Sequence, residues 1–397
     1  MDPTARTLIT GRALRGFVDG SVAVLLPAYL LALGHTPFEV GVLGTATLAG
    51  SALATLAVGA WGHHAPPRTL LLGAALLMAA TGLAFASVSA FAPLLVIAFI
   101  GTLNPGSGDV SVFLPIEQAR LAGSGNNSHE RTILFARYSL AGVLAAAVGA
   151  LAAGVPEWLA AQFGATRLDA MRAMFLLYAA IGVAIWALYR RLPMPSATAA
   201  QSKPTPLGPS RAIVVKLTAL FAVDAFAGGL VLSSLMSLWL MERFGLSLTD
   251  AGLFFFVMGL LGAASQLAAP LIARRIGLVN TMVFTHLPAN VCLVLAALAP
   301  TLPVALALLA VRALLSQMDV PTRTAYVMSV VTPAERAAAA SFTAVPRSLA
   351  SAASPALAGL LFTGGWLAAP MVLCGALKIG YDLTLWWACR GQPLQSD

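Results

Sequence analysis

The sequence predicts an all-α integral membrane protein, with twelve transmembrane helices arranged as two six-helix halves that are related by an internal repeat. Three observations carry this prediction: the composition, the number and length of the apolar runs, and a polar pattern that occurs twice. Of the 397 residues, 59% are hydrophobic and 10% are charged, whereas soluble domains are about 45–50% apolar and about 25% charged. The composition therefore excludes an ordinary soluble enzyme and a disordered chain.

The apolar runs account for the predicted helices one by one. A bilayer core about 30 Å thick requires roughly 20 apolar residues per helix. Twelve such runs follow one another along the chain, at residues 8–33, 38–60, 69–88, 91–116, 133–155, 170–189, 213–240, 250–273, 279–299, 303–325, 338–362 and 367–389. Each is predicted to be a helix, because backbone polar groups cannot stay unpaired in lipid. The first run is full length and carries charges, so we expect a retained helix and no cleavable signal peptide.

The distribution of Lys and Arg predicts the orientation of these helices. With the N-terminus inside, the cytoplasmic segments hold about 18 of the 23 Lys and Arg residues, and the outer segments hold about 3, namely Arg167, Arg172 and Arg243. Since these residues accumulate on the cytoplasmic side, both termini are expected in the cytoplasm. The alanine-rich composition favours a bacterial inner (plasma) membrane. The net charge of +8 is then a consequence of topology, so membrane lipid is an expected partner, nucleic acid is not, and the chain is expected to be a monomer.

A connector at residues 191–212 divides the chain into an N-terminal half, residues 1–190, and a C-terminal half, residues 213–397. The connector is rich in Pro and Ser and has no hydrophobic periodicity, which is typical of a linker. Motifs in the two halves occur in the same order, which favours a duplication. The matched motifs are Asp19 with Asp224, residues 36–41 with 247–252, Asp109 with Asp319, Glu130-Arg131 with Glu335-Arg336, and Arg137 with Arg347.

This arrangement of six plus six helices, with a long cytoplasmic connector and parallel repeats, resembles the major facilitator superfamily. Residues 59–68 share the glycines and one arginine of the family's motif between helices 2 and 3, without its acid. Residues 270–277 keep the basic pair and also lack the acid. The resemblance implies a secondary transporter that works by alternating access around a site formed mainly by helices 1, 4, 7 and 10. It implies neither an enzyme nor a cofactor, and the chain has no Walker motif for ATP.

Charged residues inside the predicted helices are the first candidates for function. An ionisable group at mid-bilayer costs roughly 2.5–3.5 kcal/mol, so Asp19, Asp224 and Arg312 are expected to face the bundle interior. Asp19 follows Arg15 by one helical turn, and two interpretations stand equally: a structural pair with Arg15, or a proton carrier. Asp224 has no basic residue one turn earlier and needs a proton or a partner from another helix. We favour a role in proton coupling for Asp224 as well.

Arg312 has no counterpart in the first half, and its planar guanidinium suits a substrate carboxylate or phosphate. The competing interpretation is a fixed ion pair with Asp19, Asp224 or Asp319. Helix 4 is interrupted at residues 104–109 and helix 10 at residues 319–321, where Pro and Gly weaken a helix. Each break is either a substrate or gate segment or a kink without a ligand role. The predicted substrate-binding residues are Arg312, Asp224, Asn104, Asp109, Gln317 and Asp319.

Charges at the cytoplasmic ends of the helices suggest a gate. The predicted gating residues, which would form salt bridges when the inner side closes, are Arg15, Glu130, Arg131, Arg137, Glu335, Arg336 and Arg347. The alternative is simple positive-inside anchoring. On helix 12, Lys378 and Asp382 are four residues apart and are predicted to pair with each other. We expect no metal site, because the cysteines and His286 lack metal-ligand spacing.

These observations predict a secondary active transporter of a small organic solute that couples to protons through Asp19 or Asp224 and exports an amphipathic or anionic compound. A second interpretation is ion-coupled or exchange uptake of an organic anion through Arg312. An interpretation from another class is a membrane receptor that does not transport, or a membrane enzyme that modifies lipids. Clustered acids for a metal, or a nucleophile with a base, would favour the enzyme; the sequence suggests neither.

Overall fold

The computed structural model describes residues 2–106, 111–122, 124, 128–193, 207–332 and 335–390. Within these residues the regular structure is helical, without a strand. The helices of the first half are α1 (Pro3–Ala32), α2 (Pro37–Trp61), the short η1 (Gly62–His64), α3 (Pro67–Ser87), α4 (Phe91–Ile100), α5 (Phe113–Ala122), α6 (Ser128–Ala152), α7 (Val155–Phe163) and α8 (Arg167–Tyr189). Those of the second half are α9 (Arg211–Gly229), α10 (Ser233–Phe244), α11 (Leu248–Ile276), α12 (Leu278–Ala297), α13 (Leu302–Ser316), α14 (Asp319–Val330), α15 (Arg336–Ala353), α16 (Pro355–Thr363) and α17 (Ala369–Cys389).

The predicted all-helical membrane fold is confirmed. Nine helical stretches of the described residues are long and apolar enough to cross a membrane, by length and composition. Several predicted spans correspond to one helix within a few residues, such as residues 367–389 to α17. Others, such as residues 303–325, are divided between two helices. Each division is a point where the apolar run continues but the helical hydrogen bonds do not.

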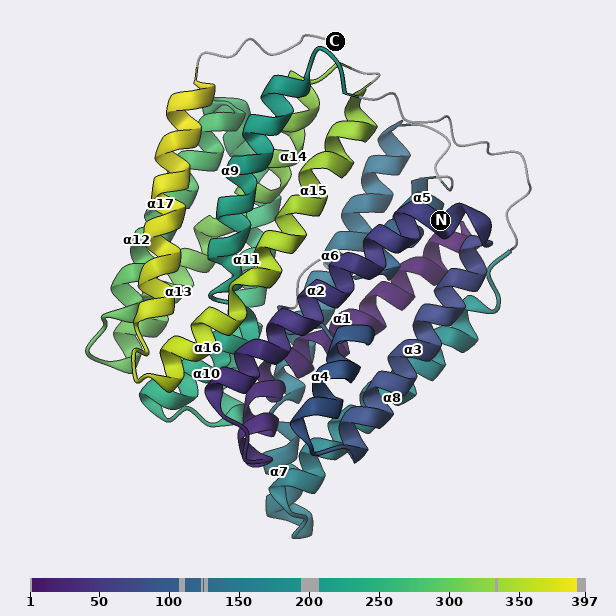
Figure 1. Ribbon diagram of the computed structural model, residues 1–397, viewed down its shortest axis with the longest axis vertical. Helices are drawn as coiled ribbons and strands as arrows, with labels where there is room; N and C mark the ends of the chain where they lie inside the picture. The colour runs from purple at the N-terminus through teal and green to yellow at the C-terminus, as the bar shows by residue number, and fades with distance from the viewer. Residues whose placement is uncertain are drawn as a thin grey trace. The chain divides into compact units, whose positions relative to one another are not determined.

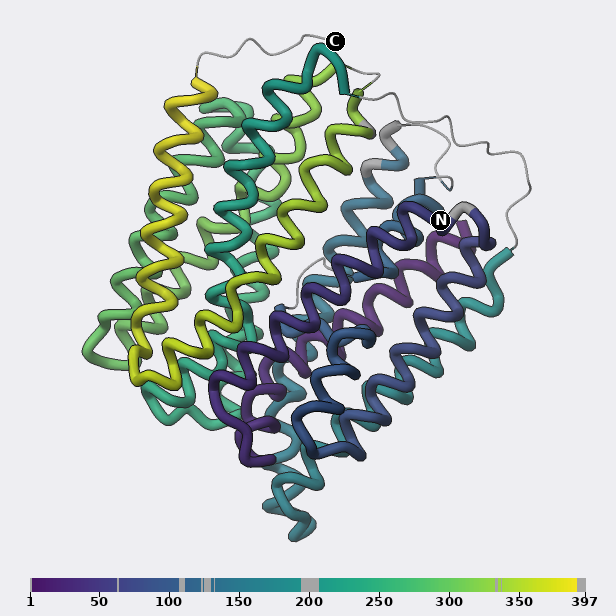
Figure 2. The backbone as a smooth tube through the Cα atoms, in the orientation of Figure 1, coloured from purple at the N-terminus to yellow at the C-terminus, as the bar shows by residue number. Residues whose placement is uncertain are grey.

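The chain forms two compact units. Unit 1 contains Met1–Ala197 with Leu232–Gly259, and unit 2 contains Thr198–Val231 with Leu260–Asp397. Within unit 1, α1 packs along α6 and α3 along α8; within unit 2, α9 packs along α15 and α12 along α17 (Figure 1; Figure 2). The pair α1–α6 in one unit and the pair α9–α15 in the other occupy equivalent places in the repeat.

Small residues bring the paired helices close together. Gly16 and Gly20 of α1 lie against the backbone of Gly142 and Ala146 on α6, so that a Cβ atom at either glycine would overlap a carbonyl oxygen. In unit 2, Gly229 of α9 lies in the same way against Ser351 of α15. Small residues at the interface permit this close approach of the helix backbones.

The helix breaks differ from the prediction. α4 ends at Ile100 and α5 begins at Phe113, so this break is wider than residues 104–109, and Asp109 lies outside the described residues. The break expected at residues 319–321 is present but lies earlier, at residues 317–318, because α13 ends at Ser316 and α14 begins at Asp319. Pro321 stands in the first turn of α14, where a missing N–H costs no hydrogen bond. A further break, after the glycine pair that ends α9, was not predicted.

Two helix starts preserve the repeat at the level of hydrogen bonds. At α2, Thr36 and Glu39 form a capping box, in which each side chain accepts a hydrogen bond from the backbone N–H of the other. At α11, the backbone N–H of Asp250 donates to the Ser247 hydroxyl over 3.0 Å. Such caps satisfy backbone donors that have no intrahelical partner. The matched motifs at residues 36–41 and 247–252 therefore start corresponding helices.

A segment of the second half belongs to unit 1. The Glu157 carboxylate on α7 accepts hydrogen bonds from the backbone N–H groups of Leu248 and Thr249, each over 3.0 Å. The Ser237 hydroxyl of α10 donates to the Val24 carbonyl of α1 over 3.0 Å.

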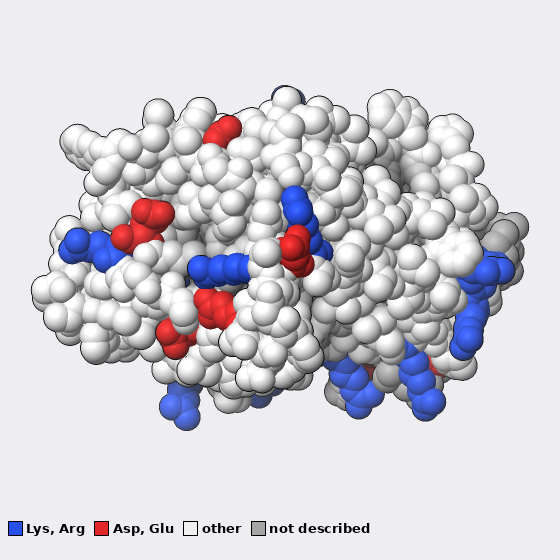
Figure 3. Space-filling view, turned by 90° about the horizontal axis from the view of Figure 1, so that it is seen from below, with Lys and Arg blue, Asp and Glu red and all other residues white. Residues whose placement is uncertain are grey.

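At the end of the molecule where α7 lies, acidic and basic side chains stand beside one another among uncharged ones (Figure 3). This end therefore has no continuous positive surface in the view of Figure 3.

Candidate functional site

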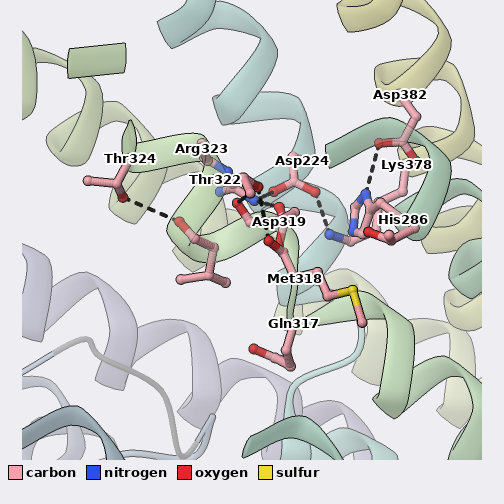
Figure 4. Close-up of polar contacts among 12 residues, drawn as sticks. Asp224, His286, Gln317, Met318, Asp319, Thr322, Arg323, Thr324, Lys378 and Asp382 are labelled. Atoms are coloured by element: carbon pink, nitrogen blue, oxygen red, sulfur yellow. Dashed lines mark hydrogen bonds and ion pairs between the residues drawn. The ribbon is translucent and has the colours of Figure 1, made fainter. Parts of the chain in front are cut away.

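Asp224 is the centre of a buried ionic group in unit 2. Its Oδ1 atom lies 2.5 Å from Lys378 Nζ on α17, and its Oδ2 atom lies 3.1 Å from an Arg323 nitrogen on α14. Arg323 also pairs with Asp319, one turn earlier on α14. Figure 4 shows Asp224 between Arg323 and Lys378. Asp224 thus pairs with side chains from two other helices. This was expected, because its own helix has no basic residue one turn earlier.

Asp382 continues this group along α17 but pairs with α12. Its Oδ1 atom lies 2.8 Å from His286 Nδ1, and its Oδ2 atom accepts a hydrogen bond from the Asn290 amide over 3.0 Å. The predicted pair of Lys378 with Asp382 is therefore not formed. Each of the two side chains instead meets an opposite charge or a donor from a neighbouring helix, which the spacing along one helix could not reveal. We call the following residues the unit 2 cluster: Asp224, His286, Asn290, Asp319, Arg323, Lys378 and Asp382.

Unit 1 holds a second buried group around Glu117 of α5. The two terminal nitrogens of Arg15 each lie 2.6 Å from one Glu117 oxygen, which is the strong bidentate geometry of an arginine–carboxylate pair. The hydroxyls of Tyr138 and Tyr189 also donate to Glu117. The guanidinium carbon of Arg15 lies 4.2 Å from the centre of the Phe113 ring. These residues are the unit 1 cluster.

The pair of Arg15 with Asp19, one of the two interpretations of Asp19 from the sequence, is replaced by this pair with Glu117. Glu117 was not among the predicted residues. The one signal in the sequence is an isolated acid just beyond the predicted span at residues 91–116, and that signal names no partner. The side chain is fully buried, so its charge depends on Arg15 for compensation.

Asp19 remains as a different kind of buried acid. It is 8% exposed, and Asn104 forms a hydrogen bond with its side chain. Arg15 and Arg12, one and two turns earlier on α1, are its positive neighbours. In the part of the chain that the structure describes, no salt bridge includes Asp19, whereas Glu117 and Asp224 are each paired.

Two further arginines of unit 2 lie near the cluster. Arg347 of α15 has Asp224, Asp319 and Arg323 as electrostatic neighbours, and its Nε atom has no hydrogen-bond partner among the described residues. Arg312 of α13 lies near Cys374 of α17, and its buried Nε atom likewise lacks a described partner. The fixed ion pair proposed for Arg312 with Asp224 or Asp319 is not formed, because Arg323 pairs with both acids.

The other predicted substrate residues lie around the helix breaks. Gln317, between α13 and α14, accepts a hydrogen bond from the Gln266 amide of α11 over 3.3 Å. Asn104, between α4 and α5, is 4% exposed. The structure thus brings Asn104 to Asp19 and Asp319 to Asp224, while Gln317 lies outside the ion pairs of the unit 2 cluster (Figure 4).

Two of the predicted gating residues in unit 2, Glu335 and Arg336, have different hydrogen-bond partners among the described residues. Glu335 stands just before α15 and accepts hydrogen bonds from the Ser210 hydroxyl, the backbone N–H of Gly208 and the Thr332 hydroxyl, which together hold the pKa of Glu335 at about 2. Glu335 therefore fixes the end of the connector and does not pair with Arg347. Arg336 donates to the Met328 carbonyl over 3.2 Å. The remaining predicted residues, Glu130, Arg131 and Arg137, are exposed on α6.

Unit 1 also contains a cavity of about 280 Å³ between α2, α3, α4 and α5. Its polar lining consists of hydroxyl groups, from Ser51, Thr69, Thr102 and Ser111, and no charged side chain lines it. It therefore supplies neither a counter-charge nor a proton carrier. Among the described residues, no group of three or more His, Cys, Asp or Glu side chains could hold a metal ion.

Comparison with known proteins identifies the family to which the chain belongs. The chain is 25% identical to the uncharacterized membrane protein YJR124C of Saccharomyces cerevisiae over 94% of this chain and 91% of the yeast protein. Among solved structures, it is similar to a bacterial homologue of the human lysosomal transporter Spinster, with a TM-score of 0.80, 14% identity, and 99% and 98% of the two chains covered. It is also similar to a D-xylose–proton symporter, with a TM-score of 0.74, 15% identity, and 97% of each chain covered. The family model of the Major Facilitator Superfamily matches residues 8–316, and the chain therefore belongs to this superfamily of transporters.

Proposed function

We propose that the chain is a proton-coupled secondary transporter of a small organic anion. In this proposal Asp19 carries the proton, and the cations of unit 2 recognise the anion. Alternating access between the two halves then exposes the site to each side of the membrane in turn. Membership of the family supports secondary transport, and the charges of the two units support the substrate class and the coupling.

The observation that carries the substrate class is the guanidinium of Arg347. In and beside the unit 2 cluster, four cations, Arg312, Arg323, Arg347 and Lys378, accompany three carboxylates, Asp224, Asp319 and Asp382. Lys378 and Arg323 are paired with Asp224 and Asp319. Within the described residues, Arg347 makes no salt bridge, although it lies beside these pairs. A guanidinium without a carboxylate partner favours an anionic ligand, because its planar fork matches a carboxylate or phosphate.

Asp19 is the proposed proton carrier because its environment differs from that of the other buried acids. In this structure Glu117 is held by a bidentate ion pair with Arg15, and Asp224 is held by ion pairs with Lys378 and Arg323. Asp19 has an amide neighbour and no salt bridge in the described part of the chain, so binding or release of a proton does not break an ion pair. This argument selects Asp19 over Asp224, although both were expected to couple protons.

A binding and exchange experiment tests the proposal. The purified chain is screened by thermal shift against a panel of monocarboxylates, dicarboxylates, phosphomonoesters and neutral sugars. Any stabilising compound is then tested in radiolabelled form for counterflow into proteoliposomes. We expect anions alone to stabilise the protein, and Arg347→Gln to weaken binding at least tenfold, about 1.4 kcal/mol. Arg347→Lys should give an intermediate affinity, because an ammonium keeps the charge without the fork.

The matched control is Arg243→Gln, since Arg243 is exposed on α10 and should leave affinity unchanged. A neutral substrate, or unchanged affinity in Arg347→Gln, would contradict the anion proposal. Binding without counterflow in sealed vesicles would identify a receptor instead.

A second candidate is uptake of an organic anion through Arg312. Its buried Nε atom without a described partner favours this role. Loss of affinity in Arg312→Gln but not in Arg347→Gln would assign the anion to Arg312.

We further propose export through an inner membrane with both termini in the cytoplasm. Flux measured in inside-out and right-side-out vesicles separates export from uptake, and protease access to a C-terminal tag tests the orientation.

A further inference from the structure

We propose that His286 and Asp382 form a second proton-binding site, and that its protonation decides whether Lys378 pairs with Asp224 or with Asp382. The proton site itself is a property of the resting protein. Only its effect on flux rests on the proposed function. The chain would then have one proton site in each unit, Asp19 in unit 1 and His286 with Asp382 in unit 2.

The first step is the environment of Asp382. Its side chain is 1% exposed, and its hydrogen-bond partners are His286 and Asn290. Among the described residues, no Lys or Arg forms a salt bridge with it. A buried carboxylate that lacks a cation is costly, so a proton shared with His286 supplies the compensation. With Nδ1 hydrogen-bonded to the carboxylate, Nε2 is the ring atom left to bind and release a proton.

The second step is to consider every charge that faces His286. The helices packed against α12 are α13, α14 and α17, and their titratable or charged groups are Arg312 on α13, Asp319, Arg323 and Tyr326 on α14, and Cys374, Lys378, Tyr381, Asp382 and Cys389 on α17. Asp224 of α9 is a further electrostatic neighbour of His286. Of these described groups, Asp382 is in hydrogen-bonding contact with His286, and the ring of Tyr381 lies edge-on with its centre 6.3 Å away. Asp382 is therefore the charged group in direct contact with His286.

The third step is the choice open to Lys378. It precedes Asp382 by four residues on α17, so both side chains lie on one face of the helix. Lys378 is an electrostatic neighbour of Asp382 but pairs with Asp224 over 2.5 Å (Figure 4). The structure thus has the arrangement expected when the imidazolium of His286 neutralises Asp382.

Loss of the proton from Nε2 reverses this preference. Asp382 is then a buried anion without a cation, and the nearest ammonium is Lys378 on its flexible four-carbon chain. A move of Lys378 to Asp382 leaves Asp224 with Arg323, which Asp319 also shares. Proton release at α12 therefore breaks the ion pair that joins α17 to α9. In this way a proton at His286 controls the charge presented by Asp224.

The composition of the chain makes a direct test possible, because it has five histidines and three lysines. The full chain is labelled with ¹⁵N-histidine and ¹⁵N-lysine, reconstituted into lipid, and studied by solid-state NMR from pH 4.5 to 9. His286→Gln and Lys378→Met assign the two signals. We expect His286 to change from imidazolium to neutral imidazole within this range, and the Lys378 Nζ signal to change at the same pH. In Asp382→Asn the Lys378 Nζ signal should no longer change with that of His286, because the second carboxylate available to Lys378 is then missing.

The control is His64→Gln, an exposed histidine after α2, which should leave both signals unchanged. In His286→Gln the Lys378 signal should no longer respond to pH. A His286 that keeps one charge state across the whole range overturns the proposal. So does a Lys378 signal that changes independently of His286.

Flux experiments separate this proposal from the proposed function. With a substrate found in the thermal-shift screen, His286→Gln should retain counterflow and lose at least tenfold in accumulation driven by a proton gradient. If the wild type shows no counterflow, the proposed transport fails, while the NMR result still decides the proton site. Equal accumulation in wild type and His286→Gln would overturn the coupling role of this site. A folding defect is recognised independently, by size-exclusion chromatography and thermal unfolding of each variant.

Discussion

Lys378 on α17 lies 2.5 Å from Asp224 on α9, whereas Asp382, one turn further along α17, pairs with His286 on α12. One helix thus supplies a cation to one neighbour and an anion to another. The unit 2 cluster is therefore held together across helices that are far apart in the sequence, and each of its members depends on the others for charge compensation.

Removal of the Lys378 ammonium should destabilise unit 2. In Lys378→Met, Asp224 keeps Arg323 alone as its counter-charge, and breaking a buried ion pair on one side costs about 3–5 kcal/mol. We expect the double variant Asp224→Asn/Lys378→Met to lose less stability than the sum of the single variants. Thermal unfolding in detergent gives the stability of the wild type, the two single variants and the double variant. Lys216→Met, at an exposed position on α9, is the control, and additive losses would argue against direct coupling.

Glu117 should be essential for the stability of unit 1. Glu117→Gln leaves the guanidinium of Arg15 buried without a carboxylate, so a loss of about 3 kcal/mol is expected. The variant Arg15→Met/Glu117→Leu removes both charges and should recover most of this loss, since paired apolar replacements of similar volume are often neutral. The free energy of unfolding in SDS titrations gives the comparison. A double variant less stable than Glu117→Gln would contradict the electrostatic explanation.

Gly20 should not tolerate a methyl group. A Cβ atom there overlaps the Ala146 carbonyl oxygen of α6, so Gly20→Ala forces α1 and α6 apart and should cost about 1–3 kcal/mol. Gly59 on α2 is the matched control, because a Cβ atom there meets no atom within 4 Å. Gly59→Ala should be neutral or stabilise the protein by about 0.5–1 kcal/mol. The melting temperatures of the two variants show whether the effect of Gly→Ala depends on contact with a neighbouring helix or on helix propensity.

Glu335 should give the fold a defined dependence on acid pH. Its pKa is lowered from 4.5 to about 2 by hydrogen bonds from Ser210, Gly208 and Thr332. A depressed pKa in the folded state contributes stability that is present above pH 4.5 and is lost as the pH falls towards 2. The difference in melting temperature between wild type and Glu335→Gln should therefore be constant above about pH 5 and shrink below it. Glu242→Gln, at an exposed position on α10, should show no such change.

Asp19 should be required for coupling and dispensable for exchange. Asp19→Asn keeps the size of the side chain and a hydrogen-bonding partner for Asn104, but it cannot bind or release a proton. We expect counterflow within about twofold of wild type and accumulation driven by a proton gradient reduced at least tenfold, a difference of about 1.4 kcal/mol or more. Full gradient-driven accumulation in Asp19→Asn would remove Asp19 from the mechanism.

The helices were predictable from the sequence because burial in lipid leaves a long local signal. The span at residues 367–389 matches α17 closely, although it contains Lys378 and Asp382. The breaks were less predictable. Pro321 was taken as a helix breaker, but it stands in a first turn, where proline is tolerated. A proline in the sequence indicates a weak point in a helix. It does not show whether a helix ends before the proline or begins near it.

The candidate site was predicted in part, for a related reason. Asp19, Asp224 and Arg312 stood out because charges are rare in apolar runs, and Asp224 does lie in a buried ionic group. Their partners could not be predicted, since the pairs Arg15–Glu117 and Lys378–Asp224 join residues 102 and 154 positions apart. Spacing along one helix suggested Asp19 for Arg15 and Asp382 for Lys378. In both cases a residue from another helix offers better geometry.

The placement of Leu232–Gly259 in unit 1 has a consequence for how the polypeptide can be divided. A gene cut within the connector, between residues 197 and 198, would encode two fragments, and the first would lack one of the two segments of unit 1. The first would lack α10 and the start of α11, with the backbone groups that Glu157 caps. The second would carry those segments without α1 and α7 to receive them. Unit 1 is thus incomplete until the second fragment supplies Leu232–Gly259, so the N-terminal half of the repeat depends on a segment of the C-terminal half to complete its fold.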